Sequence, residues 1–460
     1  MTTAVIDNSF FKEFKVLASL AWPLLIAQVT QTLMGVSDTI MAGRYNSVDM
    51  AAVAIGFGMS LPVLIFMQGI TLGLSPIISR YDGAKNTADV ANAVQQMLYI
   101  SLGMSVFVLL LLLAIPGAVG AIDMTPELAQ KTGDYLFYVL LSAPAFGIYQ
   151  TLRNYCEGLS ITVPTMMIMA TGLLVNIPVN YIFINGLFGM PEMGGAGCGL
   201  ATMLVFYTMA LATFAYTFYA TKLKKYKLYE RFLPISKPDI NYMLRLGLPI
   251  AFTLLFEVAL FAVVAVMLAP LGALTVAAHQ IALNVSSLIF MLPLSIGLAL
   301  AIRIGFLIGE GRHNHTKKAY WAAMLLAVSM VVFTASTILL FNDQIASIYS
   351  GEKAVITAAA SLLILAALFQ FSDAIQVVSA NALRGYKDTK AMLIISFISY
   401  WLVGFPVGVM LGLTDMLVPR MAAAGFWIGF ITGLSVAAVL LFMRVKVIQK
   451  RIIDDSLVRT

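Results

Sequence analysis

Charge is scarce in this chain. Asp, Glu, Lys and Arg make up 11% of its 460 residues, whereas 60% are apolar and the mean hydropathy is +0.92. Water cannot dissolve such a surface, so the composition excludes a soluble globular protein. Only two cysteines are present, Cys156 and Cys198, and we expect them near opposite membrane faces, where no disulfide joins them.

Motifs for metal, nucleotide or nucleic-acid chemistry are missing as well. His313 and His315 have no Cys or acidic companions at metal-ligand spacing, so we expect no zinc site. No Walker lysine motif is present, which excludes ATP coupling within the chain. The net charge of +6 comes from short basic loops, so we expect no nucleic-acid partner. No nucleophile, base and metal set can be assembled, so we expect neither an enzyme nor a cofactor.

Long apolar runs fill the sequence. About 20 apolar residues let a helix cross a hydrocarbon core of about 30 Å, and the runs predict an all-α membrane protein with twelve such helices. We place them at residues 16–41, 53–79, 94–119, 135–153, 163–184, 197–219, 242–269, 276–302, 319–341, 354–383, 391–413 and 425–445. The first run is far longer than the apolar part of a signal peptide, so it should remain as a helix.

The basic residues predict the orientation. With the N-terminus inside, the 28 Lys and Arg residues all fall on the cytoplasmic side except Arg44, Lys131, Lys353 and Arg420. Cytoplasmic loops carry such an excess of positive charge. We therefore expect both termini in the cytoplasm. An odd number of helices would put the basic loop 222–237 and the basic C-terminal tail on opposite sides.

The two halves of the chain resemble each other. Sliding the second half over the first pairs Pro23 with Pro249 and, at a slightly larger shift, Pro178 with Pro406. This predicts two pseudo-symmetric six-helix bundles: an N-lobe at 1–220, a cytoplasmic linker at 221–241 and a C-lobe at 242–460. Because six is even, both halves enter from the same face, which predicts parallel repeats with a substrate site between them.

Three carboxyl groups lie well inside the predicted spans: Asp38, Glu257 and Asp373. Each costs about 2.5–3.5 kcal/mol on insertion scales, so each needs a partner, water or a function. Asp38 lies about 5 Å below the outer end of its helix. Asn176, Asn180 and Thr202 reach a similar depth and are expected to meet it. Taken singly, these polar residues would indicate only hydrogen bonds between helices; beside an acid they favour a proton or cation site.

Glu257 and Asp373 are expected near the membrane midplane. Their positions in the first half are occupied by Gln31 and Gly147, so each half carries a different acidic centre. A carboxyl group in a low-dielectric pocket can exchange a proton, and an ionised one beside neutral oxygens suits sodium. The sequence leaves both couplings open, with Glu257 and Asp373 as the one candidate sodium site. The alternative is that hydrogen bonds alone satisfy these acids.

Other residues are candidates for moving or lining parts. Pro23 lacks an N–H and should weaken the first helix, which makes it a candidate hinge, although ordinary membrane helices also contain proline. His279, Gln280 and Asn284 lie near the outer end of one helix, where one face could line a cavity; packing is the alternative. Gln31 is a further candidate for lining.

Five stretches of the sequence are specific when taken together: 38–43, 176–181, 256–258, 278–280 and 383–388. They closely resemble the multidrug and toxic compound extrusion family, in its NorM-type bacterial branch, and the resemblance spans the whole chain. It implies a V-shaped pair of six-helix lobes in the bacterial inner membrane. Such a transporter, expected to be a monomer, exports organic cations such as fluoroquinolones and dyes against inward proton or sodium flow.

The resemblance also implies roles for the acidic centres. It implies an N-lobe proton or cation site at Asp38, Asn176, Asn180 and Thr202, and a C-lobe cation site at Glu257 and Asp373. Phe290 and Phe369 stand where some relatives carry tyrosines, so a phenol oxygen is absent there. Both are added to the candidate cavity lining.

A flippase of lipid-linked precursors, from the same superfamily, is the main alternative. Such a flippase should line its cavity with Arg or Lys for an anionic pyrophosphate, and no basic residue is expected deep in a span. A passive channel would lack coupling. The preferred prediction is rocker-switch antiport, in which the ion and the cationic drug compete for the carboxylates.

Overall fold

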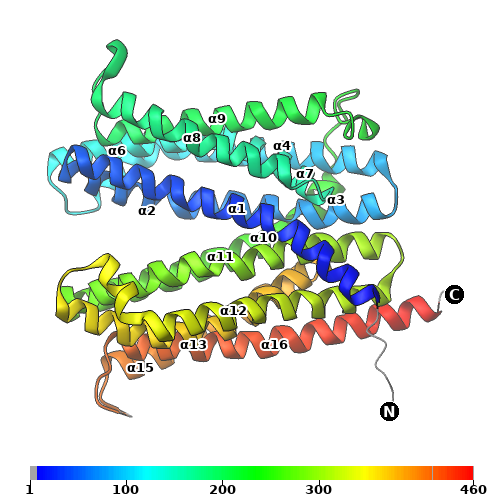
Figure 1. Ribbon diagram of the computed structural model, residues 1–460. Coiled ribbons are helices and arrows are strands. Elements are labelled where there is room, and N and C mark those ends of the chain that lie inside the picture. Colours follow the sequence, from blue (N-terminus) through cyan, green and yellow to red (C-terminus); the bar gives the residue numbers. More distant parts are fainter. Residues whose placement is uncertain (1–7, 417, 459–460) are drawn as a thin grey trace. The chain divides into compact units, whose positions relative to one another are not determined.

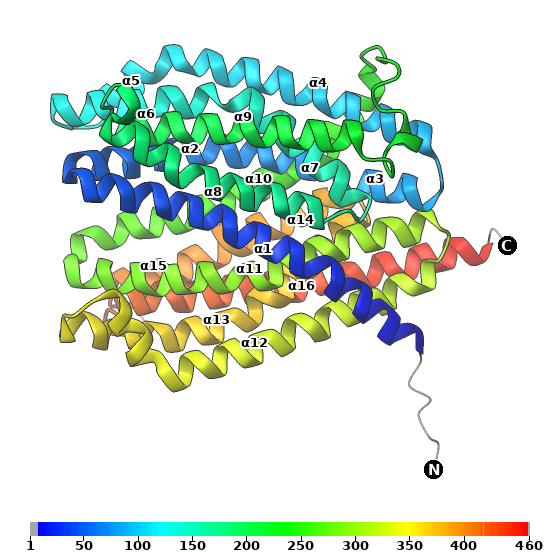
Figure 2. The same cartoon turned by 45° about the horizontal axis from the view of Figure 1, so that its top comes forward.

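The computed structural model describes residues 8–416 and 418–458, and these residues form an all-α protein, as predicted (Figures 1 and 2). Its α-helices are α1 Asn8–Tyr45, α2 Ser47–Leu72, α3 Leu74–Gly83, α4 Thr87–Leu111, α5 Ile115–Gly120, α6 Pro126–Leu141, α7 Ala143–Gly158, α8 Val163–Asn185, α9 Gly195–Tyr219, α10 Lys237–Leu268, α11 Ala273–Gly309, α12 His313–Tyr349, α13 Lys353–Gly385, α14 Thr389–Phe397, α15 Phe405–Leu413 and α16 Ala423–Val458. A π-helix, Ile398–Gly404, joins α14 to α15.

Most of these helices are long and apolar enough to cross a membrane. Among the described residues, eleven stretches are long and apolar enough to cross a membrane. The pair α6 and α7, bent by 43°, meets the same criteria when taken together, which gives twelve spans if the pair counts as one. Each predicted span overlaps one of them, so the predicted fold class is confirmed. Most of the observed helices, however, extend beyond the ends predicted for the spans. The span placed at 276–302 is Ala273–Gly309, because a helix continues through polar residues that a hydropathy pattern excludes.

The backbone contacts divide the chain into two compact units, which we describe separately. The N-terminal unit is Ile26–Ala251, and the C-terminal unit is Met1–Leu25 with Phe252–Thr460. The chain changes unit just beyond Pro23 in α1 and just beyond Pro249 in α10, the two prolines that the repeat pairs. This division differs from the lobes expected at 1–220 and 242–460, because the first segments of α1 and α10 each group with the opposite half of the sequence.

The expected linker 221–241 is held against α4 in the N-terminal unit. Gln95 of α4 donates to the Leu228 carbonyl at 2.7 Å and accepts from the Leu233 amide at 2.8 Å. Tyr226 donates to Asp82 at 2.5 Å. Burial raises the pKa of Tyr226, and the Asp82 carboxylate raises it further, so the phenol remains a donor. The linker is therefore a docked segment of this unit.

One helix contact recurs in both units. A Cβ added at Gly158, the last residue of α7, would lie 2.9 Å from the Ser75 carbonyl oxygen. One added at Gly385, the last residue of α13, would lie 2.9 Å from the Ala301 carbonyl oxygen. Ser75 and Ala301 are themselves paired by the repeat, so the two halves share packing as well as sequence pattern.

Glycines bring α15 and α16 together in the C-terminal unit. A Cβ added at Gly429 would lie 2.6 Å from the Gly404 carbonyl oxygen and from the Gly408 Cα. A Cβ added at Gly425 would clash with the Gly412 amide nitrogen. No side chain fits in such gaps, so the two backbones pack directly on each other.

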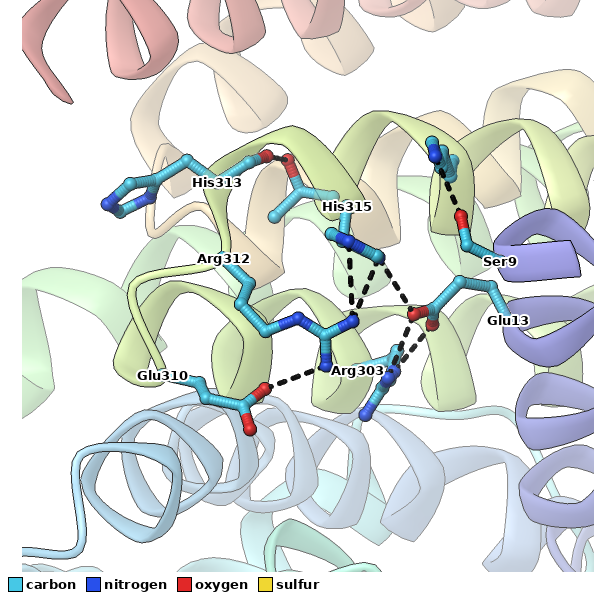
Figure 3. Close-up of polar contacts among 9 residues, drawn as sticks. Ser9, Glu13, Arg303, Glu310, Arg312, His313 and His315 are labelled. Carbon is cyan, nitrogen blue, oxygen red and sulfur yellow. Dashed lines mark hydrogen bonds and ion pairs between the residues drawn. The ribbon is translucent and has the colours of Figure 1, made fainter. Parts of the chain in front are cut away.

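Charged residues hold the start of α1 to α11 and α12 (Figure 3). Glu13 is 1% exposed and accepts from Arg303 Nε and Nη2 at 2.7 and 2.9 Å. His315 Nδ1 lies 3.6 Å from Glu13, and Arg312 bonds both the His315 ring and Glu310. A bidentate pair on a buried carboxylate is strong and directional. It anchors the first segment of α1 within the C-terminal unit.

Gly429→Ala should lower the free energy of unfolding by about 1–3 kcal/mol, because the added methyl forces α15 away from α16. Gly103→Ala in α4 is the matched control, since its Cβ meets nothing within 4 Å. Thermal unfolding of the detergent-solubilised protein measures both. Equal stability of the two variants would contradict direct backbone packing.

Glu13→Gln should lower the free energy of unfolding by about 3–5 kcal/mol, because Arg303 loses its buried counter-charge. Glu310→Gln is the control: its bond to Arg312 joins two exposed side chains, so the loss should stay below about 1 kcal/mol. Adding Arg303→Met to Glu13→Gln should recover part of the loss. Chemical unfolding checks the series, and a Glu13→Gln variant as stable as Glu310→Gln would rule out the anchor.

Candidate functional site

Six carboxylates that are buried or partly buried within the helices form two groups. One group has basic partners at N···O distances of 2.6–2.7 Å: Glu13 with Arg303, Asp49 with Lys131, and Glu157 with Arg153. The other has no basic partner among the described residues: Asp38, Glu257 and Asp373. Asp38 and Asp373 are 6% and 3% exposed, and Glu257 is partly buried. A buried carboxyl group without a base has to be protonated or matched by a cation from outside.

Asp38 in α1 is bound by three neutral donors in the N-terminal unit. Asn176 and Asn180 of α8 donate from Nδ2 to Asp38 Oδ1 at 3.0 and 2.6 Å. Thr202 of α9 donates from Oγ1 to Asp38 Oδ2 at 3.0 Å. The two asparagines are one helical turn apart and so present their amides on one face of α8. The structure thus brings together the four residues that the sequence grouped by depth.

Two amide oxygens beside Asp38 are left without a partner. Asn176 Oδ1 and Asn180 Oδ1 are buried and accept no hydrogen bond from a described residue. Leaving such an acceptor unfilled costs about 1–3 kcal/mol. A carboxylate surrounded by neutral oxygens is a donor set for a hard cation. A proton on Asp38 is the other occupant that this geometry can hold.

Cys198, one of the two cysteines, lies against this centre. Its thiol is fully buried and contacts the Asp38 main-chain oxygen at 3.6 Å. A signal for this position exists in the sequence, because Cys198 precedes Thr202 by one helical turn on α9. The thiol therefore helps to position α9 beside the acid.

Glu257 of α10 and Asp373 of α13, both in the C-terminal unit, are the acids predicted to form the second acidic centre. Within the described part of the chain, no group of three His, Cys, Asp or Glu side chains could hold a metal ion. A cation bound by these two acids therefore needs further ligands of another kind.

The candidate lining residues of α11 and α13 do not share one face. His279 is 1% exposed and accepts from Trp427 Nε1 at 3.2 Å, and Phe369 packs edge-on against the same indole. Gln280 and Asn284 are exposed and bond each other at 3.1 Å. His279 and Phe369 thus both pack against Trp427, and their cavity-lining role stays a prediction. Successive helical residues point about 100° apart, so His279 turns inward and Gln280 outward.

The other candidates lie in α1 and α11. Pro23 and Gln31 are in α1, the helix that carries Asp38. Gln31 is partly buried, and its Oε1 has no partner among the described residues. Phe290 of α11 is partly buried. A hinge at Pro23 remains a prediction.

Both halves of the chain match one protein family. The MatE family profile matches residues 23–182 and again residues 249–410. The probable multidrug resistance protein NorM of Idiomarina loihiensis is 47% identical over 439 residues, which cover 95% of each chain. The multidrug resistance protein MdtK of Pectobacterium atrosepticum is 45% identical over 448 residues, which cover 96% of this chain and 97% of the relative.

A solved structure agrees in fold. It is described as the outward-facing conformation of a multidrug resistance MATE family transporter of the MOP superfamily. It superposes with a TM-score of 0.86 at 22% identity, covering 98% of this chain and 100% of the other. At that identity the likeness concerns the fold alone.

Asp38→Asn and Asp38→Ala should differ in stability. The asparagine keeps an oxygen for Asn176 and Asn180, so its free energy of unfolding should stay within about 1 kcal/mol of the parent. Alanine leaves two buried donors, on Asn176 and Asn180, unbonded at about 1–3 kcal/mol each, and also the partly buried Thr202 hydroxyl. Thermal unfolding in detergent measures the difference. Equal losses for the two variants would mean that these hydrogen bonds do not stabilise the centre.

Proposed function

The chain belongs to the MatE family of transporters, and on that premise we propose that it exports organic cations and other xenobiotics, including fluoroquinolones and dyes, by antiport with protons or sodium ions. The observation that carries the proposal is the set of acids without a base: Asp38, Glu257 and Asp373. A cationic drug, a proton or a sodium ion supplies the missing positive charge. Because these occupants compete for the same carboxylates, entry of the ion drives release of the drug.

In this proposal the protein has two binding centres for protons or cations. Asp38, with the oxygens of Asn176, Asn180 and Thr202, takes a proton or cation in the N-terminal unit. Glu257 and Asp373 take a cation in the C-terminal unit. The two centres lie in different compact units, which supports two separate sites.

We assign the coupling movement to α1. This helix carries both Asp38 and Pro23, and the segments on either side of Pro23 belong to different compact units. Filling the Asp38 site changes the charge on the second segment, while Glu13 anchors the first. Since proline removes a helical hydrogen bond, α1 bends near Pro23 as the protein alternates between inward-open and outward-open states.

The proposed setting is the bacterial inner membrane. Both termini face the cytoplasm, in keeping with the basic residues of the linker and the C-terminal tail. The transporter works as a monomer and uses the ion gradient alone, without ATP.

Lipid-linked precursor flipping has less support. A flippase for an anionic pyrophosphate needs unpaired basic residues along its path. Two arginines within the helices, Arg153 and Arg303, are already neutralised by Glu157 and Glu13.

Ethidium efflux from proteoliposomes, under separately imposed pH and sodium gradients, tests the proposal. Asp38→Asn, and the pair Glu257→Gln with Asp373→Asn, should each reduce efflux at least tenfold, because a neutral amide cannot exchange a proton or bind a cation by charge. Asp134→Asn is the control, since this exposed acid of α6 lies outside both centres. Unchanged pumping with all three acids neutralised would exclude the mechanism, and efflux under only one gradient identifies the coupling ion.

A further inference from the structure

The linker 221–241 has one buried side and one basic side. Leu223, Tyr226 and Leu228 are buried and belong to the same apolar core as Val94 of α4. The lysines before and between them are all exposed: Lys222, Lys224, Lys225 and Lys227. The packing therefore keeps four positive charges on the exposed side of the linker.

A contact with α4 indicates the depth of the linker in the membrane. The candidate span of this helix runs from Thr87 to Gly120, and a hydrocarbon core takes about 20 residues of a helix. Tyr99 lies about that far before Gly120, at the edge of the core. Its hydroxyl donates to the Leu233 carbonyl at 2.8 Å. The linker therefore reaches the level where the lipid headgroups meet the acyl chains.

The last turns of α9 also hold the linker. Tyr229 shares a hydrogen bond of 2.6 Å with Thr217, and its ring packs against those of Phe214 and Phe218 at 5.1 and 5.6 Å between centroids. Tyr219, the last residue of α9, is 74% exposed. Aromatic side chains gather where a membrane meets water. This cluster agrees with the level that Tyr99 indicates.

Two large apolar side chains of the linker are left exposed by these contacts. Phe232 and Ile235 are 79% and 64% exposed, close in sequence to the bonded Leu233. Apolar surface is unfavourable in water and favourable in an apolar surrounding. At the level of Tyr99, the acyl chains of the lipid supply that surrounding.

The linker also carries a large excess of positive charge. It has six basic residues and two acidic ones. Lys222, Lys224 and Arg231 are exposed and form no ion pair with a described residue. An anionic phospholipid matches both features, because its phosphate attracts the cations and its acyl chains cover the apolar side chains.

We propose that the linker is a binding surface for anionic phospholipids, in which its basic side chains meet the lipid phosphates while Phe232 and Ile235 enter the acyl layer. A soluble polyanion would match the charge but would leave these two side chains in water. The choice of the cytoplasmic leaflet rests on the proposed orientation of the chain. Lipid binding itself does not depend on that orientation.

Binding of phosphatidylglycerol to the purified full-length protein in neutral detergent, followed by thermophoresis, tests the proposal. Lys222→Gln, Lys224→Gln and Arg231→Gln together should weaken binding about tenfold or more, because each basic residue beside an anionic membrane adds to the attraction. Phosphatidylcholine, which has no net charge, and inorganic phosphate, which has no acyl chains, should each bind the parent about tenfold more weakly or less.

A second triple variant is the matched control. Lys12→Gln, Lys450→Gln and Arg451→Gln remove the same charge from exposed residues of α1 and α16, outside the linker, and should leave phosphatidylglycerol binding unchanged. Equal losses for the two triple variants would mean that net charge alone attracts the lipid, and would overturn the assignment. Inorganic phosphate binding as tightly as phosphatidylglycerol would overturn it as well.

Spin labels test the depth of the linker. Cys156 and Cys198 are fully buried, so a nitroxide reagent should label only an added cysteine. In phosphatidylglycerol nanodiscs, a label on Phe232→Cys should collide more with oxygen than with a water-soluble nickel chelate, and a label on Lys224→Cys should show the reverse. Preference for the chelate at position 232 would exclude insertion. Neither test measures transport, so ethidium efflux by a variant without lipid binding would leave the proposed function standing.

Discussion

A carboxylate within a membrane span is stabilised either by a base in the protein or by a positive charge that arrives from outside. This chain contains both arrangements. Glu13, Asp49 and Glu157 form ion pairs with Arg or Lys, so basic residues of the protein itself neutralise their charges. Asp38, Glu257 and Asp373 have no basic partner among the described residues, and in the proposed mechanism their charge depends on what binds them. That difference separates the acids that support the structure from those that we assign to transport.

The two halves share a scaffold and differ in chemistry. In the repeat, Asn176 and Asn180 stand where the second half has Gly404 and Gly408. The amides reach from α8 to Asp38, whereas the glycines let α15 pack directly on α16. One substitution pattern therefore creates a polar centre in one unit and a close helix crossing in the other. Two units with the same helix arrangement therefore differ in the residues that surround their acids.

The ion pair of Glu13 also explains how the first segment of α1 is attached to α11. Glu13 and Arg303 fix its first segment to α11, and the helix then passes Pro23 before reaching Asp38. In the proposed mechanism, α1 is anchored at one end, carries an exchangeable charge on Asp38, and transmits a change of occupant along its length. The repeat places Pro249 at the same point of α10, which carries Glu257.

Much of this protein follows from local properties of the sequence. Hydropathy predicted the spans, and the helical rise placed Asn176, Asn180 and Thr202 at the depth of Asp38, because spacing along a helix converts directly into depth. Neither property specifies the rotation of a helix about its axis, which neighbouring helices decide. Only the tertiary structure therefore turned His279 toward Trp427, set Cys198 against Asp38 and introduced the π-turn before Pro406.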